Sequence, residues 1–164
     1  MSATRVLLVT ASPDRGGAET VVLQLVAGLD RARVEPFVVA LAGGAFLEEL
    51  RASGASIIDA GTVGRMRDVV RMLRVVRKVA AAIRRERISL VHTHGTFAQI
   101  VGGLAAWRAG VAAVHHVHDL YAPTRSSVDA ALQHLALRVP AAAIVAVSHS
   151  ARARLLASGA PWNR

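Results

Sequence analysis

Six short apolar runs alternate with six segments of helical character along this chain of 164 residues. Several runs are continuously apolar, which is typical of strands covered on both faces. Strands that alternate with helices form parallel sheets with right-handed crossovers. The sequence therefore predicts an α/β fold, an open three-layer α/β/α domain with a mainly parallel sheet of about six strands. We expect strands over 5–10, 35–41, 55–60, 88–93, 112–118 and 142–148, and helices over 17–31, 45–53, 64–87, 96–109, 127–138 and 149–158.

The composition is typical of one soluble domain spanning residues 1–164, because the length suits one substantial core and no change in composition marks a boundary. Aromatic residues make up only 4% of the chain, so the core must consist of Ala, Val, Leu and Ile. The absence of cysteine excludes disulfides and thiolate metal sites. No signal peptide is visible, and no run approaches the ~18 apolar residues of a membrane span. We expect a cytoplasmic protein, at most peripheral at the inner face of the cytoplasmic membrane.

The net charge of +9 favours acidic partners such as nucleic acid, anionic lipid or phosphorylated small molecules, although an arginine-rich composition can equally reflect a GC-rich genome. With so few aromatic side chains to stack on bases, we do not expect nucleic-acid binding. The predicted helix over 64–87 is amphipathic. Two interpretations remain open for it: an ordinary sheet-covering helix with a solvated basic face, which is favoured, or a surface that binds anionic membrane. Its apolar stripe contains Met66, Val69, Val70, Leu73, Val76, Ala80 and Ile83, and its basic stripe contains Arg67, Arg71, Arg74, Lys78 and Arg85.

Histidines gather where the predicted strands end, which is where open parallel sheets bind their ligands. Residues two apart on a strand share a face, so His92 pairs with His94, and His116 with His118. Three interpretations remain open: a zinc site with Asp119 as a further ligand, catalytic or hydroxyl-binding histidines, or buried histidines bonded to the backbone. The spacing lacks the tighter cues of zinc sites, and we assign no metal ligand. Six of the seven histidines lie at these strand ends: His92, His94, His115, His116, His118 and His149.

Two glycines, Gly16 and Gly17, follow the first predicted strand at the start of a helix. A glycine turn there exposes backbone N–H groups and the positive end of the helix dipole, which suits a phosphate, but a plain turn is equally possible. The motif is neither a dinucleotide-binding fingerprint nor a P-loop. Glu19 either caps the helix or faces the ligand. Ser148 follows the last strand, where its hydroxyl can cap a helix and meet a ligand, but no nucleophile elbow indicates a hydrolase.

Four segments taken in order resemble one family: "GGAE" at 16–19, "LVHTHG" at 90–95, "HHVHD" at 115–119 and "VAVSHSARARLL" at 145–156. They are similar to the N-terminal domain of a family 4 glycosyltransferase, which is one Rossmann-like half of the two-domain GT-B architecture. The resemblance implies transfer of a hexosyl group from a nucleotide sugar with retention of configuration. It also implies that no metal or other cofactor is needed.

The resemblance also implies roles for individual residues. Gly16 and Gly17 would approach the donor diphosphate, and His118 with Asp119 would form the catalytic pair beside the transferring sugar. The acceptor side would be lined by Glu19, His94, Gly95 and Ser148.

The family's C-terminal nucleotide-sugar-binding domain has no counterpart in this sequence, so we expect a fragment or a half-enzyme that is a poor catalyst alone. The expected activity is sugar transfer to a glycan or lipid-linked acceptor in the synthesis of the cell envelope. One alternative is a non-catalytic module that binds a phosphorylated sugar or lipid headgroup and needs a partner domain. Another is a histidine-based metallohydrolase.

Overall fold

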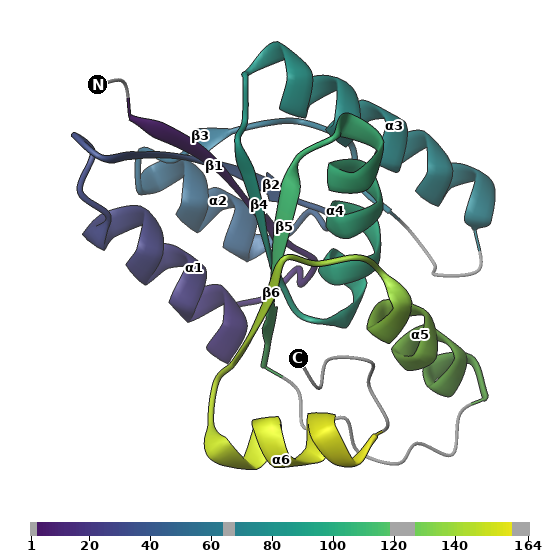
Figure 1. Ribbon diagram of the computed structural model, residues 1–164. Helices are drawn as coiled ribbons and strands as arrows, with labels where there is room; N and C mark the ends of the chain where they lie inside the picture. The colour runs from purple at the N-terminus through teal and green to yellow at the C-terminus, as the bar shows by residue number, and fades with distance from the viewer. Residues whose placement is uncertain (1–2, 64–67, 119–126, 159–164) are drawn as a thin grey trace.

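The computed structural model describes residues 3–63, 68–118 and 127–158, which form a six-stranded sheet in the order β3-β2-β1-β4-β5-β6 (Figure 1). Every neighbouring pair of strands is parallel. This architecture confirms the predicted Rossmann-like α/β fold. The strands are β1 (Thr4–Thr10), β2 (Val34–Ala40), β3 (Ser56–Ile57), β4 (Leu90–His94), β5 (Ala112–Val117) and β6 (Ala143–Ala146).

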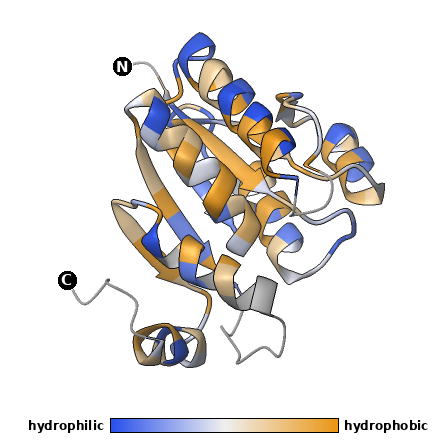
Figure 2. Cartoon of the chain, turned by 90° about the vertical axis from the view of Figure 1, so that its right-hand side faces the viewer, coloured by the Kyte–Doolittle hydropathy of each residue, from blue (hydrophilic) through white to orange (hydrophobic). Residues whose placement is uncertain are grey.

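Helices cover both faces of the sheet, which explains why the central strands are continuously apolar. Leu7 and Val9 of β1 pack on one face with α3 and α4, whereas Val6 and Leu8 pack on the other with α1 and α2. Figure 2 shows hydrophobic residues on the strands and hydrophilic ones on the outer sides of the helices. The helices are α1 (Gly17–Gly28), α2 (Ala45–Ala52), α3 (Val69–Arg85), α4 (Thr96–Ala109), α5 (Ser127–Arg138) and α6 (His149–Ala157).

The two edge strands are shorter than predicted. Strand β3 contains only Ser56–Ile57 instead of 55–60, and β6 contains Ala143–Ala146 instead of 142–148. An edge strand has one neighbour to pair with, so its ladder ends where that neighbour diverges. Apolar composition alone did not reveal this limit.

Helix α3 also differs from its prediction. The described part begins at Val69, because the Asp68 carboxylate accepts a hydrogen bond from the Arg71 backbone N–H at 2.9 Å and caps the helix. Met66 and Arg67 lie outside the described residues. The predicted apolar stripe is wrong at its start, because the buried side chains of α3 run from Val75 to Ile83. In the first turns Met72, which is not part of that stripe, packs half-buried against the core. The first turns carry three exposed apolar side chains: Val69 (54%), Val70 (68%) and Leu73 (45%).

Two adjacent glycines bring α4 close to the centre of the sheet. A Cβ atom at Gly102 would lie 2.7 Å from Cγ2 of Thr93, and one at Gly103 would lie 3.0 Å from Cε1 of His115. Any larger residue would push the helix away from β4 and β5. The close approach packs α4 against both strands, which pair in a parallel ladder and whose carboxyl ends form the candidate site. No helix in the part of the chain described here is long and apolar enough to cross a membrane.

Candidate functional site

A pocket of about 420 Å³ lies at the carboxyl ends of β1, β4 and β5. It brings together four residues that the sequence assigned to the site: Glu19, His94, Gly95 and His118. Its other lining residues are Ala11, Ser12, Ala18, Thr96 and Phe97, which sequence reasoning missed although they directly follow strands or begin helices. Parallel sheets bind ligands at this edge.

A larger hollow of about 670 Å³ lies near the opposite ends of β1 and β2. Its charged lining residues are Asp30 and Arg33, and none of the predicted site residues that the structure describes lines it. We place the candidate site in the smaller pocket, because the histidines and the starts of two helices converge there.

Glu19 connects the turn at Gly16 to the end of β1 through two hydrogen bonds. Its side chain is buried, with one carboxylate oxygen accepting from the Thr10 hydroxyl at 2.9 Å and the other from the Gly16 backbone N–H at 3.2 Å. Glu19 is the third residue of α1, so its bond to Gly16 is the capping contact that the sequence suggested. The residue therefore caps the helix and lines the pocket at the same time.

Gly16 and Gly17 lie exposed at the start of α1, next to the pocket but not among its lining residues. Gly16 has an ordinary extended backbone with φ of −119°. A Cβ atom at Gly17 would meet no described atom within 4 Å. A Cβ atom at Gly16 would lie 3.1 Å from Oε2 of Glu19, so the capping contact itself disfavours a side chain there. Internal packing does not require glycine at Gly17, which leaves close approach by a ligand as a physical reason for that residue.

Four histidines lie together on the face of the sheet that α1 and α2 cover. His94 of β4 is directly opposite His116 of β5 in the parallel register, and their ring centroids lie 5.3 Å apart. His92 lies 4.4 Å from His94, and His118 lies 4.2 Å from His116 by the same measure. The predicted pairing of side chains two apart is confirmed. His115 points to the opposite face, where its Nδ1 lies 2.8 Å from the Thr93 hydroxyl.

His92, His94 and His116 are uncharged at neutral pH. Burial, reinforced by repulsion from the neighbouring imidazoles, lowers the pKa of His94 to about 2 and those of His92 and His116 to about 4. Nδ1 of His94 lies 3.1 Å from Nε2 of His118, so one of these nitrogens carries the proton and the other accepts it. This contact links the tautomers of the two rings.

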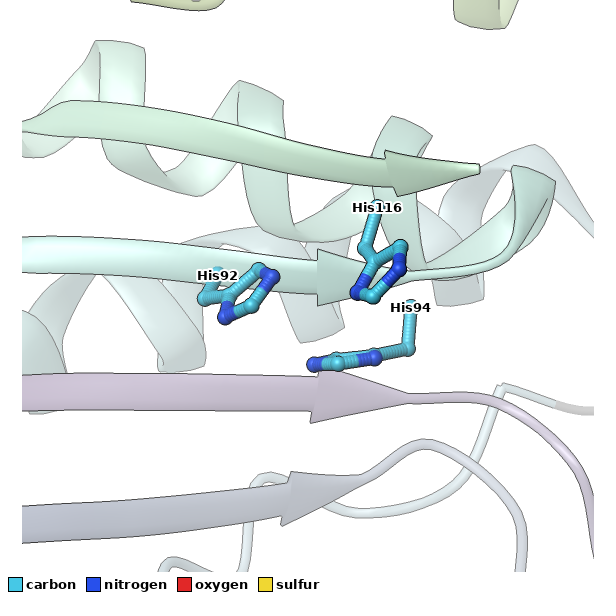
Figure 3. A group of neighbouring side chains, drawn as sticks. All are labelled: His92, His94 and His116. Atoms are coloured by element: carbon cyan, nitrogen blue, oxygen red, sulfur yellow. The ribbon is translucent and has the colours of Figure 1, made fainter. Parts of the chain in front are cut away.

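A group of three histidines has the arrangement of metal ligands. One ring nitrogen from each of His92, His94 and His116 lies within 4.8 Å of the other two. Figure 3 shows the three rings converging from β4 and β5. Asp119, the further ligand considered from the sequence, lies outside the described residues. Imidazole nitrogens suit zinc and its neighbours among the transition metals.

Gly95 and Ser148 differ in their relation to the pocket. Gly95 caps α4 with φ of +87°, a conformation that favours glycine, and its N–H donates to the His116 carbonyl at 3.2 Å. Ser148 is exposed, and its hydroxyl oxygen caps α6 by accepting from the Ala151 N–H at 3.1 Å. The structure brings Gly95 into the pocket lining but not Ser148.

Solved structures share this fold. HepE from Anabaena, in complex with UDP and glucose, has a TM-score of 0.74 and 23% identity, over 95% of this chain and 41% of HepE. A glycosyltransferase from Rickettsia africae has a TM-score of 0.72 and 19% identity, over 95% of this chain and 40% of its own. MurG from Acinetobacter baumannii has a TM-score of 0.65 and 17% identity, over 87% of this chain and 41% of its own. These likenesses establish the fold, and the chain spans about two fifths of each protein.

No curated protein matches the chain. The family model described as Glycosyltransferase Family 4 matches residues 15–164, a range that contains all the described strands except β1. That range includes the four segments on which the resemblance rests. The chain belongs to glycosyltransferase family 4.

Proposed function

We propose that this chain is the acceptor-side half of a retaining glycosyltransferase. The enzyme transfers a hexosyl group from a nucleotide sugar to a glycan or lipid-linked acceptor of the cell envelope. The observation that carries the proposal is the pocket at the carboxyl ends of β1, β4 and β5, which gathers Glu19, His94, Gly95 and His118 in a chain of this family. The HepE structures that hold UDP, or UDP-glucose, support a nucleotide-sugar donor.

The donor diphosphate is proposed to lie at Gly16 and Gly17. The first N–H groups of a helix have no partner within the helix, and they lie at the positive end of its dipole. Gly17 begins α1 and carries no side chain that would keep a phosphate at a distance. The bond from Glu19 to Gly16 holds this turn in place. The free backbone N–H groups and the positive end of the helix dipole can therefore bind a diphosphate, and no bound cation is needed.

The acceptor is proposed to bind on the side of the pocket formed by Glu19, His94 and Gly95, with Ser148 contacting it from the end of β6. His118 is the proposed catalytic residue, oriented by its bond with His94 and paired with Asp119. Uncharged imidazoles both donate and accept hydrogen bonds, which suits the hydroxyl groups of sugars. In this proposal the transfer step uses no metal cofactor.

We place the enzyme in the cytoplasm, peripheral at the inner face of the cytoplasmic membrane. The exposed Val69, Val70 and Leu73 lie on α3 beside Arg74 and Lys78, which are also exposed. Apolar side chains next to basic ones are typical of helices that lie on anionic membranes. Arg71 has a second role, because its guanidinium donates to the carbonyl and hydroxyl of Thr62. Arg67, the remaining basic residue of the proposal, lies outside the described residues.

Transfer is best measured with the product of the complete gene, incubated with radiolabelled nucleotide sugars and with glycan and lipid-linked acceptors. We expect transfer of label to an acceptor, strong loss in His118→Ala and no loss in His134→Gln, which changes an exposed histidine of α5. The 164-residue chain alone should turn over little. The complete product would instead be a non-catalytic module if it binds a phosphorylated sugar but neither transfers the sugar nor hydrolyses the donor.

A further inference from the structure

We propose that His92, His94 and His116 form a binding site for a divalent transition-metal ion, for which Zn²⁺ is the representative ligand. His92 and His94 are two residues apart on β4, so they share a face, and His116 lies opposite His94 on β5. One ring nitrogen of each lies within 4.8 Å of the other two (Figure 3). The proposal concerns metal binding by the sheet and does not rest on the proposed transfer reaction.

Each of the three rings has a buried nitrogen without a hydrogen-bond partner among the described residues: Nε2 of His92, Nε2 of His94 and Nδ1 of His116. A buried polar atom without a partner is costly, and native proteins usually satisfy it. The His94 side chain is only 2% exposed, so solvent reaches it poorly. A cation bound between the three rings would give unpartnered nitrogens of this kind a ligand to bind.

The His94–His118 contact prepares His94 for this role. When Nδ1 of His94 carries the proton and donates it to Nε2 of His118, Nε2 of His94 keeps its lone pair. Histidine ligands of metals almost always donate their other N–H to a second group in this way, which orients the ring. His118 is therefore proposed to support the site without binding the ion.

Three imidazoles with one open position are a ligand set that zinc takes in proteins. Nitrogen ligands favour Zn²⁺, Ni²⁺ and Cu²⁺ over Mg²⁺ and Ca²⁺. Zn–N bonds of about 2.0–2.1 Å require closer nitrogens than the observed upper limit of 4.8 Å, so the rings must move together on binding. His92 and His116 are only half-buried, which leaves their rings room to turn.

Isothermal titration of the untagged, EDTA-treated chain with Zn²⁺ tests the site. We expect one tightly bound equivalent, a loss of affinity of at least ~10-fold in His92→Gln and His116→Gln, and no change in His134→Gln. Mg²⁺ should not compete. The proposal is overturned if the chain does not bind Zn²⁺, if His92→Gln and His116→Gln both keep full affinity, or if His134→Gln loses affinity.

Co²⁺ provides a test on the unmodified chain, in case a variant fails to fold. Bound at three imidazoles and one open position, Co²⁺ should show the intense visible absorption of a four-coordinate ion, and Zn²⁺ should displace it at one equivalent. Nitrogen NMR of the Zn²⁺-loaded chain should show the His94 ring protonated at Nδ1. A weak, six-coordinate Co²⁺ spectrum, or His94 protonated at Nε2, would contradict the proposal.

Discussion

Nδ1 of His94 and Nε2 of His118 lie 3.1 Å apart and join the ends of β4 and β5 across the candidate pocket. If His118 is the catalytic residue, His94 is a positioning residue that acts through this bond. We expect His118→Ala to lower kcat by about 100-fold and His94→Ala by about 10-fold. His94→Asn, whose amide can replace Nδ1, should recover much of kcat. Steady-state kinetics of the complete gene product measure this, and equal losses in the Ala and Asn variants would contradict a positioning role.

Removing the Glu19 carboxylate should destabilise the start of α1. Glu19→Ala leaves the Gly16 N–H and the Thr10 hydroxyl without their acceptor, and an unsatisfied buried donor costs about 1–3 kcal/mol. Urea denaturation should therefore show a lower free energy of unfolding. The matched control is Glu48→Ala, because Glu48 is an exposed carboxylate on α2 and should change stability little. Equal stability of the two variants would show that the Glu19 contacts do not stabilise the turn.

The close packing of α4 predicts a strong effect at Gly103. A Cβ atom there would lie 2.2 Å from Cγ1 of Val139, and such overpacking costs about 1–3 kcal/mol. Thermal unfolding should show a lower Tm for Gly103→Ala. Gly28→Ala is the control, because no described atom lies within 4 Å of its added Cβ and alanine favours a helix by up to about 1 kcal/mol. A Tm for Gly103→Ala at or above that of Gly28→Ala would contradict the packing.

Acid should destabilise the metal-free protein through its buried histidines. Burial lowers the pKa of His115 from 6.5 to about 4, so between these values the unfolded chain binds a proton that the folded chain excludes. The contribution of uncharged His115 to the free energy of unfolding is complete above pH 6.5, and it is lost as the pH falls toward 4. At pH 5 the loss is about 2 kcal/mol for this residue, and His92 and His116 shift the same way.

Urea denaturation at pH 7.5 and pH 5 measures this loss. The control is His134→Gln, which replaces an exposed histidine of α5 instead of a buried one. A free energy of unfolding that stays constant from pH 7.5 to pH 5 would show that the buried histidines accept protons without opening the fold.

The exposed start of α3 should bind anionic lipid. We expect co-sedimentation with phosphatidylglycerol-rich vesicles at low salt and less with neutral vesicles, since each basic residue near such a surface contributes about 1 kcal/mol. Leu73→Asp should weaken binding, because Leu73 is 45% exposed beside Arg74. The control is Leu135→Asp, a change at an exposed leucine of α5. Co-sedimentation that depends equally on both positions would exclude a specific role for α3.

The fold and part of the site could be predicted from the sequence, because both depend on local patterns. Continuous apolar runs indicated buried parallel strands, and the period of two placed His92 with His94 and His116 with His118. Helix α3 shows that local patterns do not predict which side chains are buried. Its apolar period continues through Val69, Val70 and Leu73, but these three side chains are exposed. The apolar period predicts that a helix forms, whereas the burial of its side chains depends on which other elements lie beside it.

The sequence by itself determined the order of strands and helices along the chain, which side chains share a strand face, and that histidines gather where strands end. Only the tertiary structure decided that His116 lies opposite His94 and that Ser148 lies outside the pocket lining. The reason is physical. Periodicity is a property of a few neighbouring residues, whereas strand order and register depend on contacts between distant segments, such as those that Gly102 and Gly103 of α4 make with β4 and β5.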